Sequence, residues 1–291
     1  MSFHVESQGS GPPLLLIHGW GMHSGMWGQV AEQLALTHRV HLVDLPGHGQ
    51  SKLPSPVYGE SAARGAEPVG GEGADQDALS LTLSRERERG QDLLDKLVAQ
   101  LSAQLPEPLT VVGWSLGGQV ALRWAQLHPA QVKKLVLVAT TPCFVQQAGW
   151  SCAMAADTLQ EFAASLLQNH ALTLKRFLAL QLRGSENERE LLLDLRARLF
   201  AKGEPDVAAL KGGLDILRDT DLRNQLAQIA QPTLLIAGER DTLTPKAASE
   251  AMAQALPNSH LEVVQGAAHA PFLSHPKIFM QHLTSFLNER I

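Results

Sequence analysis

The chain contains little cysteine and no excess of positive charge, and each shortage excludes a class of protein. Cys143 and Cys152 are its only cysteines, too few for a disulfide framework, and no further ligands stand around them at the spacing of a zinc site. Lys and Arg number 24 against 29 Asp and Glu, whereas proteins that bind phosphate backbones carry a clear cationic surplus. We therefore expect two reduced thiols, no metal and no nucleic-acid partner.

Long hydrophobic runs are also missing. The segment 1–13 has neither a cationic start nor an apolar stretch, so it lacks the pattern of a secretory signal. The longest early apolar run, 14–17, is far shorter than the roughly 20 residues that a helix needs to span a bilayer. Together with the reduced cysteines, these features predict a cytoplasmic protein that does not associate with membranes.

An alternation of short apolar runs and longer amphipathic stretches occupies most of the chain. This pattern is typical of the α/β class, in which a parallel sheet has helices on both faces and its strands are continuously apolar. The predicted strands cover residues 14–17, 40–44, 109–113, 135–139, 233–237 and 261–264. The predicted helices cover residues 25–36, 91–105, 117–127, 246–256 and 276–289.

One low-complexity segment interrupts this alternation. Of the 23 residues in 54–76, 14 are Gly, Pro, Ala or Ser, and no apolar periodicity is present. Such a composition buries too little apolar surface to offset the entropy of ordering the chain. The charged run 84–89 that follows is typical of the solvated start of a helix. We expect a mobile insert over 54–90.

A second interruption, 141–206, carries helical patterns where the alternation would place a strand. An all-helical insertion into an α/β alternation usually forms a lid over a site, because its helices cannot join the sheet. We therefore predict an α/β core formed by 1–140 and 207–291, with a helical lid formed by 141–206.

A serine stands at the corner between a predicted strand and a predicted helix. The segment reads GWSLGG over 113–118, and glycines two positions on either side of Ser115 are what a tight, strained strand-to-helix turn requires. Such a turn presents the hydroxyl at the edge of the sheet, with a helix N-terminus behind it that favours an oxyanion. The alternative is a glycine-rich helix start with an ordinary capping serine. The strand–turn–helix context favours Ser115 as a nucleophile.

A serine nucleophile needs a base, and a histidine is the expected one. Among the 12 histidines, His269 stands in the small-residue loop GAAHAP after the last predicted strand, where a loop can hold an imidazole above the sheet edge. His275 is the competitor, but it precedes Pro276 and is more typical of the start of the final helix. We predict that His269 is the base.

The orienting acid should follow the preceding strand, so that the chain order is serine, acid, histidine. Asp241 is the candidate there, and Glu239 is its rival. Asp241 could instead serve as a helix cap before Pro245. The order Ser115, Asp241, His269, each after a successive strand, is more specific than any one motif and predicts a catalytic triad in which the acid holds the histidine tautomer.

The loop after the first central strand predicts an oxyanion hole. It reads HGWG over 18–21, and a second backbone donor is required at this place in such a site. We assign the donors to the backbone N–H groups of Trp20 and Leu116. His18 is expected to orient the loop by hydrogen bonding rather than to act as a base.

These segments resemble the α/β-hydrolase superfamily across almost the whole chain. LLLIHGWG, HLVDLPGHGQS, VVGWSLGG, GERD and AAHAPF stand where that superfamily has its hallmark segments. The segments VATTPCF, KRFLALQLRG, GGLDILRDTDLR and GAAHAPFLSHP narrow the resemblance to the biotin-pathway esterases, which hydrolyse the methyl ester of pimeloyl-acyl carrier protein. The resemblance implies an α/β-hydrolase fold with a helical lid after the sixth strand. The insert at 54–76 departs from the family pattern and puts substrate access in doubt.

The resemblance also implies a cofactor-free serine esterase of biotin biosynthesis with a substrate channel between core and lid. In such a channel the ester would reach the serine, and the lid segment 177–181 would line the acyl chain. The implied substrate-binding residues are Trp20, Ser115, Leu116, Phe177, Leu178, Ala179, Leu180, Gln181 and His269.

The implied partner is an acyl carrier protein that bears a pimeloyl methyl ester. Residues 175–202 carry seven Lys or Arg against four acids, and a basic lid would guide an acidic carrier by complementary charge. The expected docking residues on this lid are Arg176, Arg183, Arg189 and Arg196. The alternative is that these are solvated charges without a partner. We expect the protein itself to be a monomer.

Other functions share this fold, so the fold alone does not fix the activity. A broad-specificity short-chain carboxylesterase is the nearest alternative, because it would use the same triad and differ only at the lid. Cofactor-free haloperoxidases and C–C bond hydrolases are further enzyme alternatives. A non-catalytic ligand receptor is a different class, and retention of all three triad residues argues against it.

Overall fold

The structure is a computed structural model that describes residues 3–53, 76–185 and 187–289, with the backbone alone over 76–88. Residues 54–75 of the predicted insert lie outside the described residues. No helix of the described residues is long and apolar enough to cross a membrane.

A seven-stranded sheet forms the centre of the described structure, in the order β1-β3-β2-β4-β5-β6-β7. The edge strand β1 runs antiparallel to β3, and every other neighbouring pair is parallel. The strands are β1 (His4–Gln8), β2 (Pro13–Ile17), β3 (Arg39–Asp44), β4 (Leu109–Trp114), β5 (Val132–Val138), β6 (Thr233–Gly238) and β7 (Ser259–Val264). This is the α/β-hydrolase architecture that the sequence predicts.

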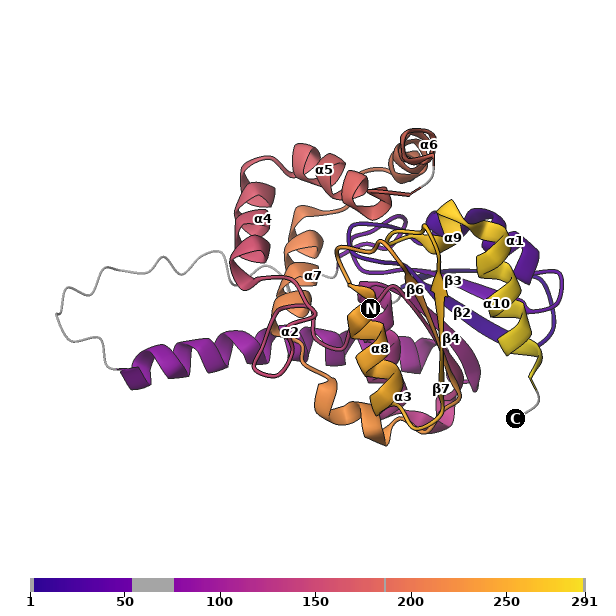
Figure 1. Cartoon of the computed structure of the whole chain (residues 1–291), viewed down its shortest axis with the longest axis horizontal. Coiled ribbons are helices and arrows are strands. Elements are labelled where there is room, and N and C mark those ends of the chain that lie inside the picture. The colour runs from indigo at the N-terminus through magenta and orange to yellow at the C-terminus, as the bar shows by residue number, and fades with distance from the viewer. Residues whose placement is uncertain (1–2, 54–75, 186, 290–291) are drawn as a thin grey trace.

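Helices cover both faces of the sheet and one of its ends. In Figure 1, α1 and α10 lie on one face, α3 and α8 lie on the other, and α4 to α6 lie beyond one end. The helices are α1 (Gly28–Leu34), α2 (Gln76–Gln104), α3 (Leu116–Leu127), α4 (Ala156–Gln168), α5 (His170–Leu182), α6 (Glu188–Ala201), α7 (Val207–Asp219), α8 (Lys246–Ala255), α9 (Pro271–Ser274) and α10 (Pro276–Asn288).

The central strands form because their residues are almost entirely apolar and both faces are covered. Residues 14–17 of β2 are completely buried, and all of β6 is buried, as expected for strands enclosed on both sides. All six predicted strands are confirmed. The edge strand β1 was not predicted, because four of the five residues in its sequence HVESQ are polar and the strand is only partly buried. Among the described residues β5 is thus the fifth strand in chain order, and the helical segment follows it, whereas the resemblance implies a lid after the sixth strand.

Helix α2 begins earlier than the sequence indicates. The predicted helix started at residue 91 and the predicted insert ran to residue 90, whereas the helix begins at Gln76. The charged run 84–89 lies within this helix, in agreement with its prediction as a helix start. Leu, Glu and Arg are good helix formers, and a helix that is anchored at one end extends at little cost. The anchor is the packing of α2 against α7: a Cβ on Gly90 would stand 2.3 Å from the carbonyl oxygen of Asp215, so only glycine allows this approach.

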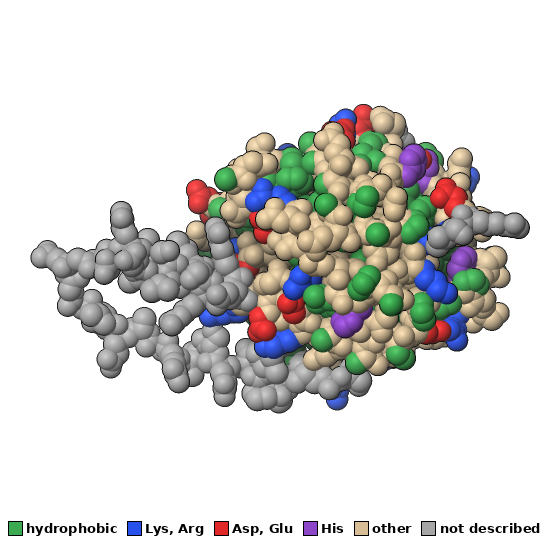
Figure 2. Space-filling view, turned by 90° about the horizontal axis from the view of Figure 1, so that it is seen from below, with side chains coloured by type: hydrophobic (Ala, Val, Ile, Leu, Met, Phe, Trp, Pro, Cys, Tyr) green, Lys and Arg blue, Asp and Glu red, His purple; other side chains and the backbone are tan. Residues whose placement is uncertain are grey.

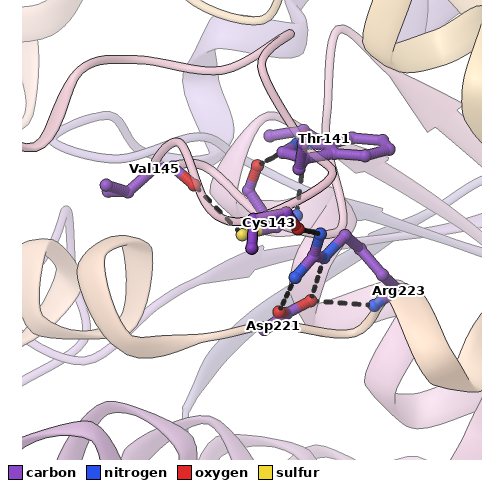
Figure 3. Close-up of polar contacts among 7 residues, drawn as sticks. Thr141, Cys143, Val145, Asp221 and Arg223 are labelled. Atoms are coloured by element: carbon purple, nitrogen blue, oxygen red, sulfur yellow. Dashed lines mark hydrogen bonds and ion pairs between the residues drawn. The ribbon is translucent and has the colours of Figure 1, made fainter.

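Two stretches of chain, one before α4 and one after α7, lie side by side (Figure 3). Cys143 and Asp221 form a β-bridge, and the amide of Leu222 donates to the carbonyl of Pro142 at 2.9 Å. The Cys143 thiol donates to the carbonyl of Val145 at 3.2 Å. Neither cysteine takes part in a disulfide within the described part of the chain. These contacts join the chain that enters α4 to the chain that leaves α7.

Candidate active site

Ser115 occupies a strained turn between β4 and α3. Its φ of 56° and ψ of −118° place a non-glycine residue where L side chains are rarely found. A Cβ on Gly113 would stand 2.3 Å from the carbonyl of Gly117, so the turn closes only without that side chain. The amide of Ser115 donates to the carbonyl of Val138 at 2.9 Å, and the hydroxyl of Thr140 donates to the Ser115 carbonyl at 2.6 Å. The neighbouring strand thus holds the strained residue in place.

His269 and Asp241 form a buried pair. The ring Nδ1 of His269 lies 2.8 Å from Oδ2 of Asp241, and the two side chains are 1% and 0% exposed. The carboxylate also accepts from the amides of Leu243 and Thr244 and from the Thr244 hydroxyl, at 2.8, 3.0 and 2.7 Å. A carboxylate accepts only, so Nδ1 carries a proton, and in the neutral ring Nε2 then keeps its lone pair. Nε2 is buried and has no hydrogen-bond partner in the described part of the chain.

The competing candidates lie elsewhere. Glu239 is exposed and accepts from the amide of Gly266 at 2.9 Å. Asp241 is not the cap of α8, because that helix has Pro245 at its N-cap. His275 is the N-cap residue of α10 and its Nδ1 lies 2.9 Å from the Ser274 hydroxyl, in agreement with its reading as a helix start.

Three loops at one end of the sheet carry the predicted triad residues, and of these Asp241 and His269 are in direct contact. Ser115 follows β4, Asp241 follows β6 and His269 follows β7. The indole Nε1 of Trp114, directly before the serine, donates to the His269 carbonyl at 2.9 Å. The loop between β7 and α9, which carries His269 and is called the histidine loop below, is therefore hydrogen-bonded to the turn that carries Ser115. The arrangement offers a hydroxyl, an imidazole with a free lone pair and a carboxylate that orients it.

The HGWG loop lies against the same serine. A Cβ on Gly19 would stand 3.2 Å from Cβ of Ser115, and a Cβ on Gly117 would stand 2.5 Å from the carbonyl of Ile17. Trp20 follows Gly19 directly. Leu116 is the first residue of α3, and the N–H groups in the first turn of a helix have no acceptor within that helix. Of the two residues predicted as oxyanion donors, Leu116 thus follows Ser115 directly, and Trp20 follows the glycine that lies against it.

His18 holds the HGWG loop and is neutral. Its Nδ1 lies 2.8 Å from the carbonyl of Gly19, and its Nε2 accepts from the amide of Leu45 at 2.9 Å. Burial, and then the neighbouring His48, lower the pKa of His18 to about 3. With both ring nitrogens engaged, His18 cannot serve as a base. It orients the loop, as the sequence predicts.

Asp44 is a supporting residue that sequence reasoning missed. Its Oδ1 accepts from the amide of Ser24 at 2.7 Å and its Oδ2 from the amide of Gln50 at 2.9 Å. Burial alone would raise the pKa of this carboxyl, but these amides and His18 hold it below its usual value. The available signal was an aspartate at the end of an apolar strand.

An apolar pocket lies between the helical segment and the core. Its lining residues are Trp20, Phe144, Met154, Thr158, Leu159, Phe162, Phe177, Leu180, Leu214, Leu217 and Leu243. The Trp20 ring is central, since its Nε1 donates to the carbonyl of Leu210 at 2.8 Å and the ring makes T-shaped contacts with Phe162 and Phe177. Trp20 therefore connects this pocket to the loop beside Ser115.

The predicted lining segment 177–181 contributes only in part. Phe177 and Leu180 line the pocket, whereas Leu178, Ala179 and Gln181 are not among its lining residues. The segment belongs to helix α5, and residues three apart share a helix face whereas consecutive residues do not. Leu178 and Gln181 are buried on another side of the helix.

The four predicted docking arginines differ in exposure. Arg176, Arg183 and Arg189 are exposed, whereas Arg196 is half-buried and its Nε has no partner among the described residues. Arg198, also on this segment, pairs with Asp194 at 2.8 Å. By contrast, the face seen in Figure 2, at the end of the sheet away from α4 to α6, mixes charges of both signs.

Comparison with known proteins places this site in a family. The model of the alpha/beta hydrolase fold family matches residues 12–276. The chain is 40% identical over 279 residues to the pimeloyl-[acyl-carrier protein] methyl ester esterase of Nitrosomonas europaea, covering 96% of this chain and 97% of that protein. It is also 40% identical over 287 residues to the protein of the same name from Chromobacterium violaceum, covering 99% and 98% of the two chains.

Solved structures agree on the fold. An esterase from Exiguobacterium antarcticum superposes with a TM-score of 0.78 at 24% identity, covering 99% of this chain and 96% of that one. A hydrolase from Pseudomonas aeruginosa gives 0.73 at 27% identity, covering 99% and 98%. The chain belongs to the alpha/beta hydrolase fold family and, within it, to the family of pimeloyl-[acyl-carrier protein] methyl ester esterases.

Proposed function

We propose that the protein is a serine esterase that hydrolyses the methyl ester of pimeloyl-acyl carrier protein, releasing methanol and pimeloyl-acyl carrier protein. The observation that carries this proposal is the buried His269–Asp241 pair, which leaves Nε2 unpartnered on the loop beside Ser115. Full-length relatives at 40% identity that are named for this reaction support the substrate.

The first half of the reaction forms an acyl-enzyme. His269 Nε2 takes the proton of the Ser115 hydroxyl as its oxygen attacks the ester carbonyl. The negative charge that develops on the carbonyl oxygen is held by the amides of Trp20 and Leu116. Asp241 stabilises the imidazolium without taking its proton. The imidazolium then protonates the leaving methoxide, and methanol departs.

The second half reverses these roles with water. His269 removes a proton from the water that attacks the acyl carbonyl, and the same two amides hold the second oxyanion. The imidazolium returns its proton to Ser115, which restores the enzyme. This sequence uses only groups of the chain and needs no organic cofactor or metal.

The apolar pocket supports an acyl substrate with a methylene chain. Its lining offers one hydroxyl, that of Thr158, and the Trp20 N–H is already bonded to Leu210. Such a surface suits apolar methylenes and penalises an unpaired charge. We place the chain of the pimeloyl group against Phe177 and Leu180, with Arg176, Arg183, Arg189 and Arg196 as the surface that an acidic carrier meets.

One comparison tests both the reaction and the carrier. Hydrolysis of pimeloyl-carrier methyl ester is measured beside hydrolysis of a free short-chain methyl ester, at low and at raised salt. We expect a preference for the carrier substrate that shrinks at high salt, because exposed charges are screened. Equal turnover of both esters at every salt concentration would favour a broad short-chain carboxylesterase. Failure of a fluorophosphonate to label Ser115 would contradict the esterase chemistry altogether.

A further inference from the structure

The end of α5 is hydrogen-bonded to the loop that carries His269. We define the α5 turn as residues 181–185. Within it, the carbonyl of Gln181 accepts from the amide of His269 at 3.0 Å, and the hydroxyl of Ser185 accepts from the amide of Ala268 at 3.3 Å. Both consecutive amides of the histidine loop therefore donate to the helical segment rather than to the core.

Arg240 ties the same turn to the loop of Asp241. Its guanidinium Nη1 donates to the carbonyl of Gly184 at 2.7 Å, while its own amide donates to the carbonyl of Ala267 at 2.8 Å. One residue next to the orienting aspartate thus contacts both the histidine loop and the α5 turn. Three side-chain or backbone links join the turn to the two loops.

The core holds the carbonyl side of the histidine loop. Trp114 donates to the His269 carbonyl at 2.9 Å, and a Cβ on Gly238 would stand 2.0 Å from the Ala268 carbonyl. The amides of Ala268 and His269, both buried residues, depend on the α5 turn. A buried amide that loses its acceptor costs more than an average hydrogen bond contributes. Displacement of the turn would therefore force the loop to rearrange.

We propose that the α5 turn positions the catalytic histidine, with Ser185 and Arg240 as positioning residues that act through His269. The imidazole is then placed correctly only when the helical segment is packed on the core. This inference rests on the proposed function, since it assigns the loop its task from the role of His269. The segment α4 to α6 then has two roles, because it lines the pocket and also positions His269.

Paired variants separate this role from a general loss of stability. Ser185→Ala and Arg240→Gln remove the two side-chain links, whereas Ser185→Thr and Arg240→Lys keep a hydroxyl and a cationic donor. Ser165→Ala is the matched serine control, because the Ser165 hydroxyl donates to the carbonyl of Glu161 within its own helix α4. Lys246→Gln is the matched cation control, because Lys246 pairs with Glu250 within α8 at 3.2 Å.

Amide hydrogen exchange measures the links without any substrate. We expect the amides of Ala268 and His269 to exchange about threefold to tenfold faster in Ser185→Ala and Arg240→Gln, with the amides of β6 unchanged. Ser185→Thr, Arg240→Lys and both controls should exchange like the wild type. Unchanged exchange in the two disrupting variants would overturn the proposal, whatever the catalytic activity of the protein.

Kinetics test the consequence for catalysis. With a small free ester that does not fill the pocket, kcat and the rate of fluorophosphonate labelling should both fall roughly tenfold in the disrupting variants, because a misplaced base slows the chemical step. KM should change less than about twofold. Faster exchange with unaltered kcat and labelling would overturn the positioning role. If the wild-type protein hydrolyses no ester and is not labelled, the proposed function fails, and exchange alone still reports whether the links exist.

Discussion

The indole of Trp20 lies directly against Gly213: a Cβ at residue 213 would stand 2.6 Å from Cδ1 of the ring. Gly213 belongs to α7 and Trp20 to the loop after β2, so two distant segments fit together only because one side chain is absent. The same ring lines the apolar pocket and is bonded to Leu210. Gly213 thereby sets the position of the Trp20 ring, which lines the pocket and belongs to the loop beside Ser115.

Substitution of that glycine is expected to disturb the pocket. Gly213→Ala should destabilise the protein by about 1–3 kcal/mol through overpacking, even though alanine favours a helix more than glycine. The displaced indole should also raise KM for a pimeloyl ester. Thermal unfolding and steady-state kinetics measure the two effects. Adding Trp20→Leu to Gly213→Ala should recover stability but not activity, and a Gly213→Ala variant as stable as the wild type would contradict this reading.

Asp241→Asn should remove most of the activity and leave the fold intact. An amide can donate to Nδ1 and so favour the wrong histidine tautomer, and in a serine protease such a change lowers kcat by about 10⁴-fold. We expect a fall of roughly 10³-fold or more in kcat here. Circular dichroism checks the fold, and Glu239→Gln serves as the neighbouring carboxylate control. A similar loss in both variants would refute the assignment of Asp241.

The stability of the protein should fall in mild acid because of His18. The folded state keeps this ring neutral, with a pKa of about 3, while the unfolded chain binds a proton below about 6.5. The unfolded state therefore binds more protons between these values, so stability decreases as the pH falls. At pH 5 the contribution of this ring is a loss of about 2 kcal/mol. Denaturant unfolding at pH 7, 6 and 5 measures it.

The matched variants for this pH dependence are His18→Asn and His260→Asn. His260→Asn makes the same substitution at an exposed histidine and serves as the matched control. His18→Asn should make the pH dependence shallower, although His48, His23 and Asp44 titrate in the same cluster and will keep part of it. An identical slope in wild type and His18→Asn would show that this ring is not the source.

Helical periodicity predicts which residues of α5 affect the acyl chain. Leu180→Ala should lower kcat/KM for a pimeloyl ester by roughly tenfold, since the lost contacts resemble those of one or two buried methylenes. The effect on an acetate ester should be much smaller. Leu172→Ala, at an exposed position of the same helix, is the control and should change neither substrate. Equal effects on both esters would mean that the pocket does not hold the chain.

The sequence was sufficient to predict those features of the fold and the site that depend on residues close together in the chain. The apolar runs predicted every central strand, and the glycines around Ser115 predicted the strained turn, because close packing of backbone leaves no alternative to glycine there. Position after successive strands also predicted that Asp241 and His269 would meet. The edge strand β1 was not predicted, because a polar and partly buried strand has no apolar pattern. The start of α2 was not predicted either, because it depends on the packing of this helix against α7 at Gly90.

The chain alone thus determined the fold class, the family and the identity of the residues around Ser115. Only the tertiary structure decided that Phe177 and Leu180 face the pocket while Gln181 turns its carbonyl to His269, that Gly213 makes room for Trp20, and that Arg240 reaches the α5 turn. Those relationships join residues far apart in the sequence, and their energies come from burial and geometry that exist only once the sheet has brought the segments together.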